Sequence, residues 1–580
     1  MPGSIYRATP GSPYVGRRHQ FRGCPVTAGM RSEPANVPNR LKSRPRTIAA
    51  PLHVVCSIER KSCMTATIHT VAVEKTSGDL ARQDQLAWKL AELATRAKDA
   101  PQDDEAVAMA KNRIIDNAAI ALGAANESAV KVARSDAMSA KGTGKATVWG
   151  LEDKFAPVPA AFANAVGVRF LDNDDCYLAA EYSHPDDNIS PIIAVGQHLG
   201  VSGADILRGI VVAYEVHVAL VGTGDGTGIC LHKHKVDHMT HIAAGTAAGI
   251  SSMLGLTTEQ TYHAINFAVH NAISSRQSRK GDIGAQKEFV PGFSAEISIK
   301  AVHHAMHGLK GPNPVYEGVD SIIRRFLNGR DDENAVYKVA LAEPGVGALR
   351  NIMKTYPKQH AFEYQGQAII DLALQLREQL PKKGESVDLD QIEKIVLETS
   401  HHTHHVIGTD AQDPQKIDPD SPRGTLDHSI MFAIARCIQT GEFHKDRAYQ
   451  MTQPEKDELR ALMARIETQF DQRWEDLYHD QDPNVQAYGG RMIVTLADGS
   501  EVADEKTRAN AHPGGDTPWQ RPDYEAKLAD YTKDLVSDGE RARFIKAVDG
   551  MDSLSGDELA TINLIVDAGT LEAPETQGIY

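Results

Sequence analysis

Apolar residues recur at three- and four-residue spacings along most of the chain between about Leu80 and Leu327. Side chains at this spacing fall on one face of a helix. The pattern predicts helices over residues 85–97, 105–125, 203–221, 241–256, 259–273 and 294–306. Many of their apolar positions are Ala or Gly, and small residues let helices approach one another closely. This part of the chain is therefore predicted to form a large all-helical bundle with buried central helices.

The pattern changes after Pro344. The segments IEKIVLETS (392–400) and GGRMIVTLADGSEV (489–502) are typical of strands, and Asp498-Gly499 predicts a turn in the second. Residues 363–380 and 426–441 have the helical spacing. The predicted fold class is mainly α, with a large helical bundle domain and a smaller α+β lid domain.

The change of pattern also suggests domain boundaries. We expect the first part of the helical domain at residues 79–343 and the α+β domain at 344–512. Residues 513–580 should return to the bundle as a C-terminal helical segment, with charged helical stretches at 523–547 and 556–568.

Residues 1–78 are expected to form an extension outside the fold. Residues 1–63 hold eleven Lys or Arg and only two acids, without lasting periodicity. Such a leader can be an organelle transit peptide, which would place the protein in the mitochondrial matrix. The interpretation that we favour is that translation starts at Met64 and that the protein is cytoplasmic.

The charge balance excludes several kinds of partner. The chain has 62 Lys and Arg against 77 Asp and Glu, a net charge of −15. This argues against a general nucleic-acid or anionic-membrane surface.

The apolar runs are far shorter than the roughly 20 residues that span a bilayer, so a soluble protein is expected. The six cysteines are scattered without a CxxC motif, which indicates a reducing compartment and neither disulfides nor an iron–sulfur cluster.

Three local motifs have the residue types of ligand sites. The glycine-rich segment 222–228 follows a predicted helix and lacks the GK[ST] ending of a phosphate loop, so a flexible insertion is favoured over nucleotide binding. A second segment holds four histidines, and a polar loop is favoured there over a metal site. They are His232, His234, His238 and His241. The histidines of 401–405 directly continue a predicted strand, whose alternation would split them between two faces. No cofactor and no metal are predicted.

Cationic residues are more informative when they are taken together. They are Arg276, Arg279, Lys280, Lys287, Lys354, Lys358 and His360. Each one alone is typical of a surface charge. Jointly they indicate a basic pocket, which a multiply charged carboxylate requires because Arg and Lys neutralise its charge and hydrogen-bond its oxygens.

The segment His184-Pro185-Asp186-Asp187-Asn188 interrupts an Ala-rich helical pattern. Proline is favoured in the first turn of a helix, and Asp and Asn side chains cap free backbone N–H groups there. The segment therefore predicts a helix N-terminus. Its free N–H groups and dipole would favour a carboxylate beside the titratable imidazole of His184.

Several blocks together resemble the MmgE/PrpD family. They are LDNDDCYLAAEYSHPDDN, GICLHKHKVDHMTHIAAG, SRQSRKGDIGAQKEFVPGFSAE, TYPKQHAFEYQGQAIIDLA, and TSHHTHHVIGT with LDHS. The resemblance runs in order from about Leu80 to about Ala547. It implies a helical domain with a smaller α+β lid, usually in a homodimer. It also implies removal of water from 2-methylcitrate to give 2-methyl-cis-aconitate in the methylcitrate cycle, without an iron–sulfur cluster.

The resemblance also implies site residues. The acidic motif of the family falls on Asp172 and Asp175, and its histidines fall on His184 and His238. The lysine before the bundle helix falls on Lys287, in a loop or first helical turn, where we expect its loss to change the melting temperature very little. These five residues are the catalytic candidates: His184, His238 and Lys287 for proton transfer, and the two aspartates to orient the imidazoles.

The remaining candidates would bind a tricarboxylate substrate. They are Asp187, Asn188, Arg279, Lys280, Lys354, Lys358 and His360. The family's lid-hinge lysine falls on either Lys354 or Lys358, and the sequence leaves that choice open. One departure is Cys176, where relatives commonly have Thr, because a thiol hydrogen-bonds only weakly.

Two rival functions are also compatible with the sequence. One is decarboxylation of cis-aconitate, ranked lower because the block Tyr177 to Tyr182 resembles the dehydratase pattern. The other is a non-catalytic carboxylate- or metal-binding protein on the same scaffold.

Overall fold

The computed structural model describes residues 66–76, 80–222, 226–281 and 283–579. Residues 1–63 of the expected leader and part of the glycine-rich segment 222–228 therefore lie outside the described residues. The described residues contain a large hydrophobic core built from helices and a second core built from helices and a sheet. The predicted fold class, mainly α with a smaller α+β part, is confirmed.

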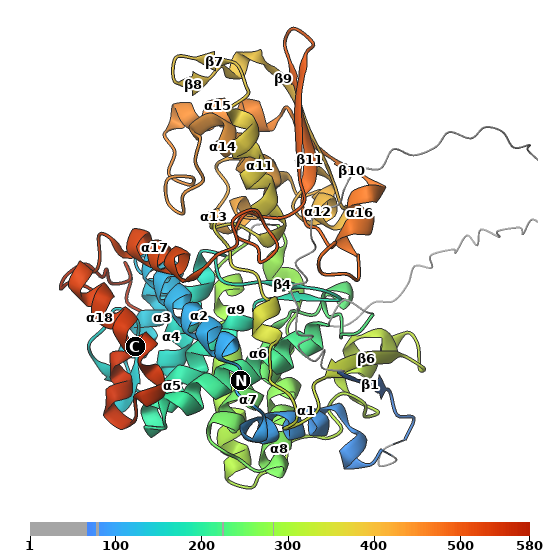
Figure 1. Ribbon diagram of the computed structural model, residues 1–580, viewed down its shortest axis with the longest axis vertical. Coiled ribbons are helices and arrows are strands. Elements are labelled where there is room, and N and C mark those ends of the chain that lie inside the picture. Colours follow the sequence, from blue (N-terminus) through green and yellow to red (C-terminus); the bar gives the residue numbers. More distant parts are fainter. Residues whose placement is uncertain (1–65, 77–79, 223–225, 282, 580) are drawn as a thin grey trace, which may run out of the picture. The chain divides into compact units, whose positions relative to one another are not determined.

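The first core is a helical bundle, labelled in Figure 1. Its helices are α1 (Leu86–Arg96), α2 (Asp104–Gly123), α3 (Ser128–Met138), α4 (Pro157–Phe170), α5 (Ile189–Leu199), α6 (Gly203–Val221), α7 (Met239–Met253), α8 (Thr258–Asn271), α9 (Gln286–Met306) and α10 (Ile322–Phe326). The six helices predicted from periodicity correspond to α1, α2, α6, α7, α8 and α9. Every residue of α7 is buried, so this helix is the centre of the bundle.

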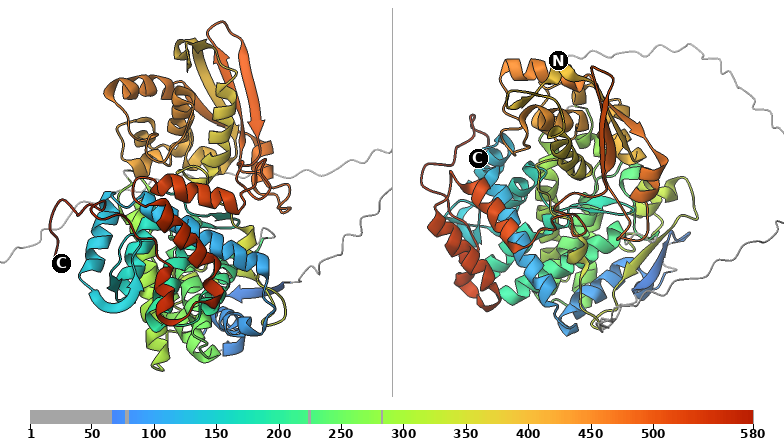
Figure 2. Two further views of the ribbon diagram at one scale, coloured as in Figure 1. Left: turned by 60° about the vertical axis from the view of Figure 1, so that its left-hand side comes forward. Right: turned by 45° about the horizontal axis from the view of Figure 1, so that its top comes forward.

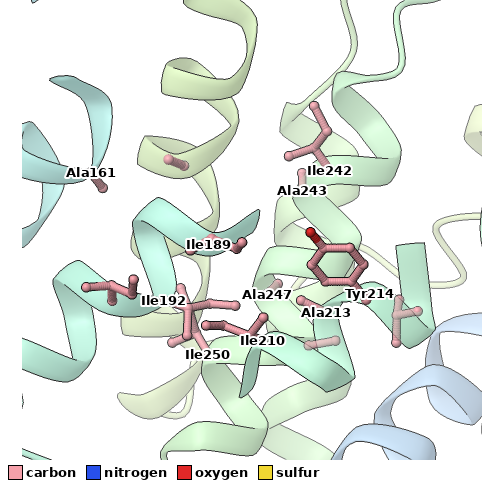
Figure 3. Close-up of a cluster of buried hydrophobic side chains, with 14 of the residues drawn as sticks. Ala161, Ile189, Ile192, Ile210, Ala213, Tyr214, Ile242, Ala243, Ala247 and Ile250 are labelled. Atoms are coloured by element: carbon pink, nitrogen blue, oxygen red, sulfur yellow. The ribbon is translucent and has the colours of Figure 1, made fainter. Parts of the chain in front are cut away.

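Small residues let the central helices pack closely. A Cβ atom at Gly249 of α7 would lie 2.6 Å from the carbonyl oxygen of Gly209 of α6, closer than any side chain can approach. Figure 3 shows how aliphatic side chains from α5, α6 and α7 fill the space around this crossing. The Ala- and Gly-rich pattern is therefore needed where α6 and α7 cross.

The second core contains a four-stranded sheet. Its strands are β9 (Ile392–Thr399), β10 (Ile466–Phe470), β11 (Gly490–Leu496) and β12 (Glu501–Lys506), in the order β10-β9-β11-β12. Strand β9 pairs in parallel with β10 and antiparallel with β11, and β11 and β12 form the hairpin whose turn at Asp498-Gly499 the sequence predicts. Helices α11 (Gln367–Arg377) and α14 (Ile430–Thr440) pack beside the sheet (Figure 1). This part also contains α13 (Arg423–Leu426), α15 (Gln453–Met463) and α16 (Gln472–Tyr478).

The histidines of 401–405 are not part of a strand, contrary to the prediction. They form helix α12 (His401–Val406), which begins where the Ser400 hydroxyl accepts a hydrogen bond from the Thr403 N–H at 3.2 Å. Serine at this cap position ends the strand and starts a helix. His402 consequently lies within ring contact of Tyr182 and His232.

Pairs of short strands complete the fold. Strand β1 (Thr67–Ala72) pairs antiparallel with β6 (Val336–Leu341), and Val71 is buried in the first core. The boundary of the extension at residue 78 is therefore wrong, because part of that range belongs to the fold. The other pairs are β2 (Lys141–Thr147) with β3 (Lys154–Phe155), β4 (Tyr177–Leu178) with β5 (Tyr182–Ser183), and β7 (Lys382–Lys383) with β8 (Ser386–Val387).

The C-terminal helices α17 (Arg521–Thr532) and α18 (Asp538–Asp549) lie against α2, as Figure 2 shows. Their buried residues Tyr524, Leu528 and Phe544 join the first core. The helix predicted over 556–568 is mostly absent, since only a 3₁₀ helix at Gly556–Thr561 forms there. Among the described residues, no helix is both long enough and apolar enough to cross a membrane.

Candidate active site

A cluster of buried charges lies where segments of both cores meet. The loop after α4 contributes Asp172, the first turn of α9 contributes Lys287, and the segment before α11 contributes Lys358. Asp427 and His428, which lie between α13 and α14, also belong to it. Asp172 has a φ of 48°, an uncommon conformation for a residue other than glycine.

Asp172 is surrounded by cations. Its carboxylate lies 2.8 Å from the Nζ of Lys287, 2.5 Å from the Nζ of Lys358 and 3.2 Å from a guanidinium nitrogen of Arg169. Burial alone would raise the pKa of Asp172, but Arg169, Lys287 and Lys358 hold that pKa well below its usual range. The carboxylate is therefore ionised.

Lys287 also contacts a second carboxylate. Its Nζ lies 3.2 Å from an oxygen of Asp427, and no part of the lysine side chain is exposed. Asp427 accepts a hydrogen bond from Nδ1 of His428, whose Nε2 lies 3.6 Å from Asp172. Burial and the neighbouring Lys287 lower the pKa of His428 to about 4, so its imidazole is neutral near pH 7.

His184 has a defined tautomer. Its Nδ1 lies 2.7 Å from the backbone carbonyl oxygen of Asp175, and because a carbonyl oxygen only accepts, Nδ1 carries the proton. Its Nε2 then holds the lone pair. Burial, with Arg169 and Lys358 nearby, places the pKa of His184 well below its ordinary value, so the ring is neutral.

His238 has the opposite tautomer. Its Nε2 lies 3.1 Å from a guanidinium nitrogen of Arg279, which can only donate, so Nε2 accepts and Nδ1 carries the proton. Among the described residues, this buried Nδ1 has no hydrogen-bond partner. Burial and Arg279 place the pKa of His238 well below its ordinary value, and its ring centre lies 5.5 Å from that of His184. Arg279 is itself held by Asp237, with 2.7 Å between nitrogen and oxygen.

The segment after His184 starts a helix, as predicted, but its side chains do not cap it. A 3₁₀ turn (Pro185–Asn188) leads into α5, and neither start has a side-chain cap. Asn188 instead accepts from the Thr246 hydroxyl at 2.8 Å and lies 2.9 Å from His217, so it ties the turn to α6 and α7. The two buried carboxylate oxygens of Asp187 have no hydrogen-bond partner among the described residues, and burial raises the pKa of this group well above its usual range.

Asp175 faces the interior of the bundle. It lies 3.2 Å from the guanidinium of Arg113 and accepts a hydrogen bond of 3.0 Å from the Tyr214 hydroxyl. Its backbone carbonyl oxygen is the group that fixes the tautomer of His184. Asp175 therefore supports His184 through its main chain rather than through its carboxylate.

The structure brings most of the sequence candidates together, but not all. Lys280 and Lys354 are exposed and make no ion pair among the described residues. His360 is buried, but its Nε2 lies 2.9 Å from Asp371. Between the two lysines that the sequence left open, Lys358 is the one that lies in the cluster.

Sequence reasoning missed several members of the cluster. They are Arg169, Asp174, Asp237, Asp427 and His428. Asp174 lies inside the block LDNDDC, and Asp427 and His428 lie inside LDHS, so the blocks held a signal that was not assigned to residues. Asp237 lies inside the block GICLHKHKVDHMTHIAAG and had the same kind of signal. Arg169 lies outside the blocks, and its importance depends on burial.

Cys176 lies beside the cluster rather than in it. Its backbone exchanges two hydrogen bonds with that of Tyr356, at 3.0 and 2.8 Å. Its side chain is buried in a group of aromatic residues that includes Tyr356 and Tyr364, and burial raises the pKa of its thiol well above the usual range. The thiol of Cys176 is therefore neutral.

Among the described residues, three sets of side chains are close enough to share a metal ion. Two belong to the buried cluster, namely Asp172 with Asp427 and His428, and Asp174 with Asp186 and Asp187. In the first set, the ammonium group of Lys287 already contacts both carboxylates. The third set, Glu181 with Cys230 and His232, lies outside the cluster. The four histidines of 232–241 do not share a centre, since Nε2 of His241 lies 2.8 Å from the carbonyl oxygen of Ile229.

Relatives that are named for their function match a large part of the chain. A "probable 2-methylcitrate dehydratase" of Saccharomyces cerevisiae is 26% identical over 371 residues, which cover 60% of this chain and 66% of that protein. The mitochondrial 2-methylcitrate dehydratase of Yarrowia lipolytica is 28% identical over 372 residues, or 61% of this chain and 66% of that protein. The 2-methylcitrate dehydratase of Salmonella typhimurium is 24% identical over 384 residues, or 62% and 72%. The chain thus spans just under two thirds of the length of the two yeast relatives.

Two family models cover most of the chain. The MmgE/PrpD N-terminal domain matches residues 84–335, and the MmgE/PrpD C-terminal domain matches residues 360–553. The buried cluster draws its residues from both matched regions. The chain belongs to the MmgE/PrpD family.

Proposed function

We propose that this protein removes water from 2-methylcitrate to give 2-methyl-cis-aconitate, a step in propionate catabolism through the methylcitrate cycle. The observation that carries the proposal is the pair of neutral imidazoles, His184 and His238, whose ring centres lie 5.5 Å apart beside buried cations. The names of the relatives supply the substrate.

The proposed base is His184. Elimination begins with removal of a proton from the carbon beside a carboxylate, which requires a neutral base with a free lone pair. The bond to the Asp175 carbonyl oxygen leaves the lone pair on Nε2 of His184, and the lowered pKa keeps the ring unprotonated near pH 7. Both conditions support its role.

His238 is proposed to assist departure of the substrate hydroxyl, which must leave as water and so needs a proton. Arg279 occupies Nε2 of His238, so the unpartnered N–H at Nδ1 can hydrogen-bond the departing oxygen. The proton that His184 takes from carbon would then pass to this oxygen, which restores His184 to its neutral form. The substrate would take this hydrogen bond, which no described residue accepts.

The negative charge that develops on the substrate needs cations around it. Lys287 and Lys358 share the carboxylate of Asp172, and Arg279 is held by Asp237. We propose that these three cations bind the substrate carboxylates. We also propose that the chain acts as a homodimer, which light scattering of the purified protein would test.

A product assay tests the proposed function against its rivals. Purified full-length protein is incubated separately with 2-methylcitrate, citrate and cis-aconitate, and products are followed by absorbance of the new double bond and by mass spectrometry. The proposal expects an unsaturated tricarboxylate from 2-methylcitrate. Itaconate and carbon dioxide from cis-aconitate would indicate a decarboxylase instead, and no product from any of the three would indicate a binding protein.

A further inference from the structure

Three side chains with metal-binding atoms converge outside the cluster of His184 and His238. Glu181 lies between β4 and β5, Cys230 lies in the loop after α6, and His232 begins a 3₁₀ helix (His232–His234). Nδ1 of His232 lies 3.1 Å from Oε1 of Glu181 and 3.5 Å from the Sγ of Cys230. All three donor atoms lie within 4.8 Å of one another.

These separations match those around a tetrahedral zinc ion. Bonds of about 2.3 Å to sulfur, about 2.0 Å to nitrogen and about 2.1 Å to oxygen at the tetrahedral angle separate the donor atoms by roughly 3.4 to 3.6 Å. The two distances above lie within a few tenths of an ångström of these values. Small shifts of the side chains would therefore be enough to bind the ion.

The carboxylate is already held in position. Oε2 of Glu181 accepts backbone N–H bonds from Leu231 at 2.5 Å and from His232 at 2.6 Å. Oε1 faces Nδ1 of His232. The ring of Tyr182 lies over that of His232, with 4.8 Å between their centres. Such supporting contacts fix ligand orientation and reduce the cost of assembling a metal site.

The site is reachable from solvent. The side chain of His232 is 27% exposed and Cys230 is half-buried, whereas Glu181 is buried. A thiolate favours soft or borderline cations over Mg²⁺ or Ca²⁺. We propose that Glu181, Cys230 and His232 bind one thiophilic divalent cation such as Zn²⁺, with a fourth position open to water. Binding displaces the protons of the Cys230 thiol and of Nδ1 of His232, so affinity rises with pH.

The position of this site suggests a structural role. Tyr182 and Glu181 precede His184 by two and three residues, and His232 precedes His238 by six. A metal that joins Glu181 to His232 would therefore tie the segment of one proposed catalytic histidine to that of the other. It would not touch the reacting groups, so removal of the metal is expected to lower thermal stability more than turnover.

Cobalt spectroscopy tests the site directly. Titration of the full-length protein with Co²⁺ is expected to produce a thiolate-to-cobalt charge-transfer band that saturates at one equivalent. Cys230→Ser should remove the band, and His232→Asn should weaken Co²⁺ binding at least tenfold. His234→Ala is the matched control, since this histidine lies in the same 3₁₀ helix but outside the set, and it should leave the band unchanged. No band in the unmodified protein, or the same band in Cys230→Ser, would overturn the proposal.

Protection from alkylation tests the site without any variant. Iodoacetamide labelling of the unmodified protein, read by peptide mass spectrometry, is expected to slow at least tenfold at Cys230 when Zn²⁺ is present. Mg²⁺ in place of Zn²⁺ is the control, and it should leave the labelling rate of Cys230 unchanged because a thiolate disfavours this hard cation. Equal labelling of Cys230 with and without Zn²⁺ would refute the site even if the variants failed to fold.

Discussion

Lys287 shows how a proposed catalytic residue can also stabilise the fold. Its ammonium group is wholly enclosed by protein and contacts Asp172 and Asp427 at 2.8 and 3.2 Å. Removing one member of a buried ion pair leaves its partner without compensation in a medium of low dielectric constant. The expectation from the sequence, that this lysine could be lost with little change in melting temperature, does not fit such a position.

Lys287→Ala is predicted to lower both turnover and stability. Turnover of 2-methylcitrate should fall by roughly a hundredfold or more, as for loss of an electrostatic or acid–base group. The free energy of unfolding should fall by about 3–5 kcal/mol, because Asp172 loses one of its three cations and Asp427 loses the ammonium group that it contacts. Steady-state kinetics and urea unfolding measure the two effects. Lys300→Ala is the control on the same helix, since its ion pair with Glu296 is exposed.

The outcomes separate the possible roles of Lys287. Unchanged kinetics with reduced stability would make it a structural lysine only. A raised KM with normal kcat would make it a group that binds substrate and transition state equally.

The lowered pKa values of the two histidines predict how the rate depends on pH. A base acts only when it is neutral, and the pKa of His184 lies well below the ordinary 6.5. The ring therefore stays neutral as the pH falls through 6.5, and kcat/KM should remain on its plateau there. A pH–rate profile should place the acid limb below pH 6.5. A midpoint at or above 6.5 would show that the base is another group or that His184 is more solvated than the structure indicates.

The site could be predicted from the sequence only in part. His184, His238, Lys287 and Asp172 were found through the family blocks, and the structure places them close together. The choice between Lys354 and Lys358 required the structure, because only burial distinguishes two lysines four residues apart. The tautomers of the two histidines could not be predicted either, since they depend on a carbonyl oxygen and a guanidinium distant in sequence.

Among the helices, the crossing of α6 and α7 depends on glycine. Gly249→Ala would place a Cβ 2.6 Å from the backbone oxygen of Gly209 and 2.8 Å from the side chain of Ala213, so the helices must separate. Overpacking of this kind typically costs about 1–3 kcal/mol, and urea unfolding should show a loss in that range. Gly539→Ala in α18, where a new Cβ meets nothing within 4 Å, should be neutral or slightly stabilising. Equal stability of the two variants would mean that the crossing is looser than described.

The elements were predicted well where one physical signal dominated. Periodicity located α1, α2 and α6 to α9 because each buries a long apolar face. The same reasoning failed at α12, where a single serine cap redirects the chain after β9. It also failed at residues 556–568, where burial of Leu559 and Ile562 stabilises a short 3₁₀ turn rather than a helix.

In the molecule as a whole, the fold begins earlier in the chain than the sequence suggested. Val71 is buried, and β1 pairs with β6 from Thr67 onward. A protein that starts at Met64 keeps this pairing, so its melting temperature and turnover should equal those of the full chain. A protein that starts at Leu80 loses β1 and should unfold at a lower temperature. Differential scanning fluorimetry of the three proteins checks this, and a large loss in melting temperature on removing residues 1–63 would contradict it.

The domain boundaries at residues 343 and 512 remain a prediction.

The most direct test of the whole account is the turnover of 2-methylcitrate by the unmodified protein and by His184→Asn. Asparagine retains a side-chain N–H that can donate to the Asp175 carbonyl oxygen, but it has no basic nitrogen. We predict that the unmodified protein forms 2-methyl-cis-aconitate, and that His184→Asn lowers kcat by roughly 10²- to 10⁴-fold with little change in KM. Absence of the alkene with the unmodified protein, or full turnover by His184→Asn, would contradict the account.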